Sequence, residues 1–490
     1  MQTLPSSLYT PESVRRIDQK AIHDHGIAGY TLMRRAGKVV LDLLRKNYPQ
    51  AKKILVLCGA GNNAGDGYVV ARLAQQQGMD VRVVSLTDPE KLQGDAHQAY
   101  QQWHESAVLS VNDVALINDA DVIVDALLGT GITRDVEGSW LNWIEAVNHS
   151  DKAVISVDLP SGLDALTGAI KGAAVTADIT VTFIGLKLGL FTASGKACCG
   201  EVIFDSLGVP ESVYESESPV AELLGSPDCY ELPRRRHDSH KGLHGHVLVV
   251  GGNHGMPGAV ILAARAALRS GAGMVTVVTR VEHVAAVAVA CPEAMVYGSE
   301  NGNLPVLSVE KIAVVAIGPG LGQDAWAHRL LMQAIALNRP MILDADALNL
   351  VAEKKIQIKV PHIITPHPGE AAHLLCKDNA SSIQQDRLTA IHQLYDLLSG
   401  VVVLKGSGSM IYDGGHLGVC PFGNPAMAVA GMGDVLTGVI AACVAQGMDL
   451  NQAARAGVCV HARAGDLAAN GDTHGMLASD VIDVLKQVIK

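Results

Sequence analysis

Short apolar runs recur through the sequence, and each one ends in a polar loop that carries glycine or aspartate. In the first half these runs lie at 53–58, 81–86, 121–125, 153–158 and 179–183, and in the second half at 246–250, 274–279, 314–317, 341–343, 362–365 and 401–404. Continuous apolar runs are typical of parallel strands buried on both faces, and helical periodicity occurs between several of them. The alternation predicts an α/β fold with parallel sheets.

The chain is long enough for more than one domain. Its 490 residues exceed the usual size of a single compact domain, and 48% of them are hydrophobic, which is ample for large cores. Between Pro210 and Pro233 the composition shifts towards Glu, Ser and Pro. We therefore expect two α/β domains, at 1–225 and 226–490, without an internal repeat.

Charge and cysteine usage exclude several classes of function. The net charge is −11 and no long basic run is present, so we expect no nucleic-acid partner. The nine cysteines have no zinc-ligand spacing and are interpreted as free thiols in a reducing compartment. The sequence has neither a signal pattern nor a run long enough to span a membrane. We expect a cytoplasmic protein with no membrane partner, assembled as a homo-oligomer.

Three loops of the first half carry the polar residues of a candidate site. They are Gly59 to Gly67 (Gly-Ala-Gly-Asn-Asn-Ala-Gly-Asp-Gly), Asp125 to Asp135, and Asp158 to Ser161. Loops that follow parallel strands share the carboxyl edge of the sheet, where ligands bind. The first loop lacks the Gly-x-Gly-x-x-Gly spacing, and its polar groups can hold a ribose or a monovalent cation as well as a phosphate. Each aspartate alone could cap a helix, but three at one edge favour a site.

The loops of the second half suggest a nucleotide site with a phosphate-transfer centre. Lys405 is followed by small residues and can approach phosphate oxygens, although no Walker A motif is present. His367 lies between two prolines and either binds a ligand or stabilises its loop. Asp344, Asp346 and Glu370 either bind Mg²⁺ or cap helices, and the sequence leaves that choice open.

The stretch 424–438 predicts a tight glycine turn that opens a helix, with Asp434 at its mouth. The first turn of a helix attracts anions such as phosphate. A carboxylate beside a bound phosphate can take a proton from an attacking hydroxyl. The alternative is an ordinary glycine turn with Asp434 as the N-cap.

These first-half loops resemble those of the NAD(P)H-hydrate epimerase family, which has a three-layer Rossmann-like fold. The resemblance implies a catalytic acid/base at Asp158 and a potassium ion held by Asn63, Asp125 and Ser161. Ala64 stands where the family usually has glycine, which costs about 1 kcal/mol if its φ is positive. The implied contacts to the hydrated nucleotide are Asn62, Asn63, Ala64, Gly65, Asp66, Gly129, Thr130, Gly131, Ile132, Thr133, Arg134, Asp135 and Asp158.

The second half resembles the ribokinase-like fold and, within it, the ADP/ATP-dependent NAD(P)H-hydrate dehydratases. The motifs that carry this resemblance are 241–252, 318–322, 343–349, 365–370 and 430–436. It implies ADP as co-substrate, with Mg²⁺, and Asp434 as the base. Residues Ala259, Gly320, His367 and Asp434 are then expected to line the hydrated-nucleotide site, and Lys405, Gly406, Ser407, Gly408, Ser409 and Gly433 to contact the adenine nucleotide.

Together the two resemblances predict a bifunctional enzyme that repairs hydrated nicotinamide cofactors. The first domain would interconvert R- and S-NAD(P)HX, and the second would dehydrate the S form to NAD(P)H at the expense of ADP, giving AMP and phosphate. One alternative is a ribokinase-like kinase for a hydroxymethyl heterocycle. Another makes the first half a non-catalytic binding or scaffold module. The sequence leaves open the preference for ADP or ATP and for NADHX or NADPHX.

Overall fold

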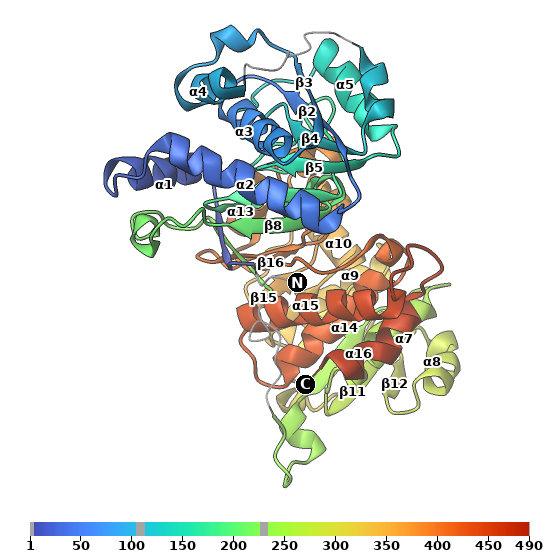
Figure 1. The fold of residues 1–490 in the computed structure, drawn as a ribbon. Coiled ribbons are helices and arrows are strands. Elements are labelled where there is room, and N and C mark those ends of the chain that lie inside the picture. The colour runs from blue at the N-terminus through green and yellow to red at the C-terminus, as the bar shows by residue number, and fades with distance from the viewer. Residues whose placement is uncertain (1–3, 104–112, 226–233, 490) are drawn as a thin grey trace. The chain divides into compact units, whose positions relative to one another are not determined.

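The computed structural model describes residues 4–103, 113–225 and 234–489 (Figure 1). By its internal contacts the chain divides into two compact units, Met1–Ala221 and Glu222–Lys490. Among the described residues, none of the helices combines the length and apolar composition needed to cross a bilayer.

The first unit contains a parallel sheet with the strand order β3-β2-β4-β5-β6-β8. Its strands are β2 (Lys53–Cys58), β3 (Asp80–Ser85), β4 (Val122–Ala126), β5 (Ala153–Val157), β6 (Ile179–Phe183) and β8 (Glu201–Asp205). A short pair, β1 (Ser7–Tyr9) and β7 (Leu186–Lys187), lies outside this order. Strand β2 pairs in parallel with both β3 and β4, so the loops that follow β2 and β4 meet at one edge.

Helices cover both faces of this sheet because successive strand residues point to opposite sides. Ile54 and Val56 belong to the core shared with helices α1 to α4, whereas Leu55 and Leu57 pack with Trp143 of α5. The helices are α1 (Pro11–His23), α2 (Gly29–Asn47), α3 (Asn62–Gln76), α4 (Gly94–Trp103), α5 (Ser139–Asn148) and α6 (Gly195–Cys199). The unit therefore has three layers, as predicted.

The second unit contains a longer sheet with the order β12-β11-β10-β13-β14-β15-β16-β17-β18-β9. Its strands are β9 (Ala221–Leu223), β10 (His246–Val250), β11 (Met274–Thr279), β12 (Met295–Gly298), β13 (Val314–Ile317), β14 (Met341–Leu343), β15 (His362–Ile364), β16 (Val401–Leu404), β17 (Met410–Tyr412) and β18 (Leu417–Val419). Pairing is parallel from β12 to β16, and β17 and β18 form an antiparallel hairpin that the sequence analysis did not predict.

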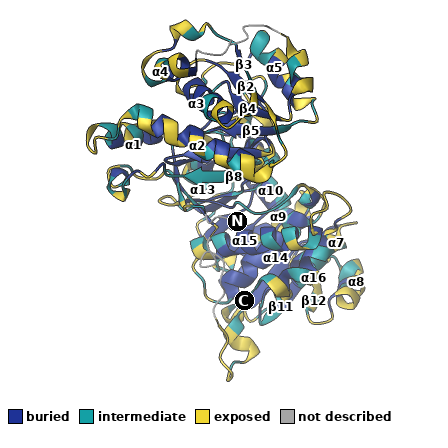
Figure 2. Cartoon of the chain, in the orientation of Figure 1, coloured by how far each residue is buried: buried dark blue, intermediate teal, exposed yellow. Residues whose placement is uncertain are grey.

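Two helical layers also enclose this second sheet, and Figure 2 shows its strands largely buried. Val249, Ala316 and Val403 pack in one core with the helices α7 (Pro257–Arg269), α14 (Met432–Ala445), α15 (Leu450–Ala469) and α16 (Ala478–Val488). The other helices are α8 (Val284–Ala290), α9 (Ala325–Ala336), α10 (Asp346–Lys354), α11 (Pro368–Leu374), α12 (Ala380–Gln385) and α13 (Arg387–Leu398). The predicted α/β class with parallel sheets is confirmed.

Close packing of α14 on α7 depends on small residues. A Cβ on Gly438 would lie 2.2 Å from the carbonyl oxygen of Ala263, so α14 approaches α7 with no room for a side chain there. This packing fixes the helix whose first turn carries Asp434.

Candidate active sites

The loops after β2 and β4 lie against each other in the first unit. A Cβ on Gly59 would lie 1.9 Å from the carbonyl oxygen of Leu127, and a Cβ on Gly129 would lie 3.3 Å from the Cβ of Asn63. The N-caps of α3 and α5 are Gly61 and Gly138, so none of the predicted site aspartates serves as the cap of the following helix.

The predicted nucleotide loop 62–66 forms the first turn of α3. Ala64 lies inside this helix and is not among the residues with positive φ, so its methyl group causes no backbone strain. Gly65 faces the neighbouring helix instead, because a Cβ there would lie 2.8 Å from Cα of Ala96. The absence of a side chain at Gly65 therefore lets α3 pack closely against α4. The second predicted loop, 129–135, is largely exposed, and Arg15 donates a hydrogen bond of 3.1 Å to the carbonyl of Thr130.

Asp125 and Ser161 form a buried oxygen cluster. Asp125 is fully buried, and its Oδ1 accepts from Ser161 Oγ (2.5 Å) while its Oδ2 accepts from Ser161 N (2.9 Å) and Ser156 Oγ (2.8 Å). Burial raises the pKa of Asp125, and these hydrogen bonds oppose the rise. Nearby, the side-chain amide of Asn63 is buried, and neither of its polar atoms has a partner within the described residues. An oxygen-only donor set with an unpartnered amide fits a monovalent cation.

Asp158 follows β5 in a left-handed backbone conformation, with φ of 66°. Its Oδ1 accepts from Phe183 N (3.2 Å) and Thr182 Oγ1 (3.3 Å), and it forms an ion pair with Nζ of Lys187. Within the described residues, Oδ2 has no partner. The Asp158 side chain is 21% exposed, whereas that of Lys187 is 1% exposed. One carboxylate oxygen is thus fixed and the other is available to a ligand.

Lys187 was missed by the sequence analysis. Its ammonium group also donates to Thr182 Oγ1 (3.0 Å) and to the carbonyl of Phe183 (3.1 Å), so all three of its protons have acceptors. The only signal in the sequence was a single lysine inside the apolar stretch 184–191. A buried lysine requires a partner, and here that partner is Asp158.

Two further carboxyl groups lie near Asp158. Burial raises the pKa of Asp66 well above its ordinary value, and the charges of Asp158 and Asp18 raise it further. The pKa of Asp18, on α1, is raised by burial and then by Asp158. A carboxyl group that remains protonated beside an ionised one can donate a proton to a leaving hydroxyl. The raised pKa values of Asp66 and Asp18 favour the protonated form of both carboxyl groups.

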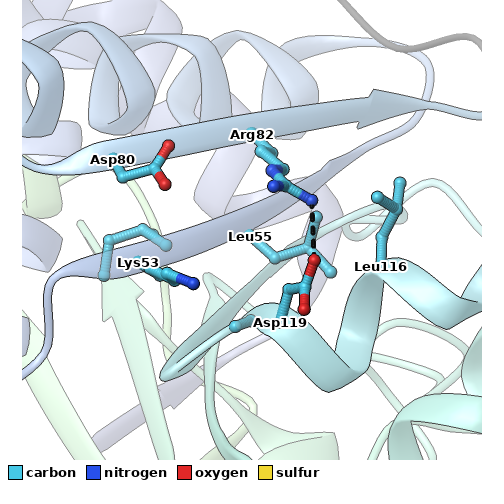
Figure 3. Close-up of a pocket in the computed structure, with 8 residues that line it drawn as sticks. Lys53, Leu55, Asp80, Arg82, Leu116 and Asp119 are labelled. Atoms are coloured by element: carbon cyan, nitrogen blue, oxygen red, sulfur yellow. Dashed lines mark hydrogen bonds and ion pairs between the residues drawn. The ribbon is translucent and has the colours of Figure 1, made fainter.

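A small pocket lies at the opposite edge of the same sheet and contains none of these residues. It is lined at the beginnings of β2 and β3 by Lys53 and Asp80, and Arg82 makes an ion pair of 3.1 Å with Asp119 there (Figure 3). Because ligands bind at the carboxyl ends of parallel strands, we do not assign this pocket to the site.

The second unit gathers charged groups around Lys405, at the end of β16. Its Nζ lies 2.6 Å from Asp344 Oδ1 and 3.7 Å from Glu370 Oε2, and Thr437 Oγ1 donates to Asp344 Oδ2 (2.8 Å). Burial acts to lower the pKa of Lys405, but the carboxylates of Asp344 and Glu370 raise it overall. A Cβ on Gly433 would lie 3.4 Å from Nζ, so the mouth of α14 also borders this cluster.

Asp434 lies in the first turn of α14, whose N-cap is Gly431. The alternative that Asp434 is itself the N-cap is therefore wrong: Gly431 takes the left-handed conformation that this tight turn requires, and the helix begins before Asp434. Burial and the charge of Asp344 together raise the pKa of Asp434 to about 7, against the opposing charge of Lys405. A carboxylate with this pKa is suited to act as a general base near neutral pH.

His367 stabilises its own loop. Its Nδ1 accepts from Gly369 N (3.0 Å) and Glu370 N (3.3 Å), and Glu370 Oε2 accepts from His367 N (2.8 Å), which makes a reciprocal cap at the start of α11. The imidazole is 56% exposed, and its Nε2 lies 3.4 Å from Glu370 Oε1. Of the two functions that the sequence left open, the loop-stabilising one is observed.

The carboxylates considered for Mg²⁺ have protein partners. Asp346 Oδ2 accepts from Gly322 N (2.8 Å) and so holds the loop 318–322, while Asp344 and Glu370 belong to the Lys405 cluster. Across the described residues, no group of three or more His, Cys, Asp or Glu side chains could hold a metal ion. In the same loop Gly320 packs beside Ala259, because a Cβ on Gly320 would lie 3.1 Å from that of Ala259.

Two family models match the chain. Residues 29–189 match the YjeF-related protein N-terminus, and residues 247–487 match NAD(P)H-hydrate dehydratase. Among solved structures, ADP/ATP-dependent NAD(P)H-hydrate dehydratase from Bacillus subtilis, co-crystallised with ATP/Mg²⁺, is 30% identical and covers 53% of this chain and 93% of its own, with a TM-score of 0.49.

Full-length relatives cover nearly the whole sequence. The bifunctional NAD(P)H-hydrate repair enzyme Nnr of Coxiella burnetii is 43% identical over 98% of this chain and 99% of its own. That of Vibrio cholerae is 41% identical over 99% of both chains, and that of Escherichia coli is 40% identical over 99% of this chain and 95% of its own. The chain belongs to the family of bifunctional NAD(P)H-hydrate repair enzymes.

Proposed function

We propose that this chain restores hydrated nicotinamide cofactors in two steps. The domain at 1–225 interconverts R- and S-NAD(P)HX, and the domain at 226–490 dehydrates S-NAD(P)HX to NAD(P)H while ADP becomes AMP and phosphate. The family membership supports the pair of reactions. The observation that carries the second reaction is Asp434, a carboxylate with a pKa of about 7 at a helix mouth beside Lys405.

In the first domain, Asp158 acts as the acid/base at C6 of the reduced nicotinamide ring. Its free Oδ2 faces the substrate, because Lys187 and Phe183 N occupy Oδ1. Loss and return of the C6 hydroxyl needs a proton at the leaving oxygen, which Asp66 or Asp158 can supply. Loops 62–66 and 129–135 hold the nucleotide.

Asn63, Asp125 and Ser161 are the residues that would hold a potassium ion. When bound, the ion supplies a positive charge that offsets the buried Asp125 carboxylate. The unpartnered Asn63 amide supports this assignment.

In the second domain, Asp434 removes the proton of the C6 hydroxyl as that oxygen takes the terminal phosphoryl group of ADP. Lys405 and the N–H groups at the start of α14 stabilise the negative charge that develops on the phosphoryl oxygens. Phosphorylation converts hydroxide into a good leaving group, and the ring nitrogen donates the electrons that expel phosphate. The cationic ring then loses a proton from C5, which forms the C5–C6 double bond and gives NAD(P)H.

Binding in the second domain is divided between two groups of residues. Ala259, Gly320 and His367 hold the hydrated nucleotide, and the loop 405–409 with Gly433 holds the adenine nucleotide. Mg²⁺ accompanies the nucleotide phosphates, since it commonly binds through phosphate oxygens and water. We further propose that the protein acts in the cytoplasm and forms a homo-oligomer. Light scattering after gel filtration tests the oligomeric state.

Chromatography of an NADHX epimer mixture incubated with the protein tests the proposal, with ADP and ATP supplied separately. Both epimers should disappear and NADH should form. Asp158→Ala should leave R-NADHX behind while S-NADHX is consumed, and Asp434→Asn should stop NADH formation while the epimers still interconvert. Each variant is the folding control of the other. A stable phosphorylated product without NADH would favour the heterocycle kinase, and loss of both activities in each variant would contradict the two-site assignment.

A further inference from the structure

Arg387 is a fully buried arginine at the start of α13, with 0% of its surface exposed. Its guanidinium group donates three hydrogen bonds to backbone carbonyls of the segment 404–408 and one to a glutamine side chain. Nη2 donates to the carbonyls of Leu404 (3.0 Å) and Gly408 (3.3 Å), and Nη1 donates to the carbonyl of Lys405 (3.2 Å) and to Gln384 Oε1 (2.7 Å). Burial lowers the pKa of Arg387 to about 10, so the group is still cationic at neutral pH. The loop between β16 and β17 therefore wraps around a buried positive charge.

This wrapping determines which way the peptide groups of the loop point. In a trans peptide the carbonyl of one residue and the N–H of the next point in opposite directions. Because the carbonyls of Lys405 and Gly408 turn towards Arg387, the N–H groups of Gly406 and Ser409 turn away from it. Gly406 and Ser407 are exposed, so this outer side of the loop is accessible to a ligand.

Gly406 gives independent evidence that the loop is built around the guanidinium. Its φ is 138°, and a Cβ there would lie 2.7 Å from Nη1 of Arg387. Both the backbone conformation and the space next to the guanidinium require glycine at this position. The loop cannot keep this shape with a larger residue at 406 unless Arg387 moves.

We infer that Arg387 is a positioning residue for the adenine-nucleotide site. By binding the carbonyls on the inner side of loop 405–409, it orients the N–H groups of the loop towards the phosphates. The inference rests on the proposed nucleotide-binding role of that loop. Arg387 touches neither substrate. It acts through the carbonyls that it binds, and its charge, in a poorly solvated interior, adds to the attraction for a diphosphate. The same group therefore shapes the loop and makes its surroundings more positive.

Arg387→Met and Arg387→Lys in the full-length protein test the inference, with Arg269→Met, an exposed arginine on α7, as matched control. We expect Arg387→Met to raise KM for ADP about tenfold or more, the equivalent of one well-placed hydrogen bond or charge. KM for S-NADHX and the epimerase activity of the same chain should change by less than about twofold. The KM of Arg387→Lys for ADP should lie between those of the wild type and Arg387→Met, because lysine keeps the charge but not the planar fork. Calorimetric titration with ADP gives the affinity directly.

Chemical rescue separates positioning from a general structural role. Arg387→Ala leaves a cavity of guanidinium shape, and millimolar guanidinium chloride should restore much of the ADP affinity to that variant while leaving Arg269→Met unchanged. If folded Arg387→Met or Arg387→Lys binds ADP as tightly as the wild type, or if both KM values rise equally without rescue, the inference is wrong. If the wild-type protein itself neither binds ADP nor forms NADH, the proposed function fails first and the inference falls with it.

Discussion

Replacement of Asp434 by asparagine should stabilise the second unit while it removes activity. Burial raises the pKa of Asp434 from 3.8 to about 7, so the folded protein disfavours the ionised carboxylate. A shift of about 3 units corresponds to ~4 kcal/mol, and because the side chain is only partly buried we expect ~2–4 kcal/mol at alkaline pH. Asparagine has nearly the same shape and no charge. Lys405 keeps Asp344 and Glu370 as partners, so the substitution leaves no buried cation unpaired.

The pH dependence of this gain follows from the sign of the shift. Below about pH 4 the carboxyl group is protonated in both states, so Asp434 costs no stability. Between about pH 4 and 7 only the unfolded chain releases the proton, so the wild type loses stability relative to Asp434→Asn as the pH rises. Above about pH 7 both states are ionised and the difference stays constant.

Scanning calorimetry at about pH 5, 6.5 and 8 measures the effect. The transition of the second unit is identified by its upward shift with ADP. Asp434→Asn should melt about 5–10 °C above the wild type at about pH 8, and by clearly less at about pH 5. Asp483→Asn, which removes an exposed carboxylate of α16, is the control and should show no such trend. A difference that is constant with pH, or a wild type that is the more stable protein at pH 8, would refute the reasoning.

Three further predictions concern activity. Because Asp434 must be ionised to act as base, kcat for dehydration at saturating ADP should fall about tenfold per pH unit below about pH 7, and a flat profile would remove Asp434 from that role. Lys187→Met should abolish epimerisation and lower the first unit's unfolding temperature, since it leaves the Asp158 carboxylate without its cation; epimerisation at the wild-type rate would show that Lys187 is dispensable. Exchange of potassium for tetramethylammonium should raise KM for R-NADHX in the wild type but not in Asp125→Asn, and equal responses would contradict the cation site.

The sequence allowed the strand–loop alternation and the carboxyl-edge sites to be predicted because both follow from local pattern. Buried parallel strands are continuous apolar runs, and ligand loops follow their ends. The resemblance added roles for Asp158 and Asp434, and the structure places each of them next to a buried or partly buried lysine. The roles themselves stay predictions until variants are assayed.

The remaining features depend on contacts between residues far apart in the chain. Lys187 reaches Asp158 across 29 positions, and Arg387 binds carbonyls 17 to 21 positions away. No spacing rule links such pairs, because the register of the sheet and the packing of α13 create them. The cap that His367 makes at the start of α11 follows from local hydrogen bonding, and the sequence analysis had left it open whether His367 stabilises its loop or binds a ligand. The β17–β18 hairpin has short strands that follow the run of parallel strands and carry no local signal of their direction.

The left-handed backbone at Asp158 limits how this chain can evolve. Only glycine, asparagine and aspartate adopt that conformation readily, so the backbone restricts substitutions at position 158 before chemistry does. A lineage that loses epimerisation can drift to asparagine or glycine and keep the fold. A β-branched residue there would strain the loop after β5 and disturb Ser161, whose hydroxyl and amide hold Asp125. Loss of the first activity through the tolerated residues leaves a folded chain with its second domain intact.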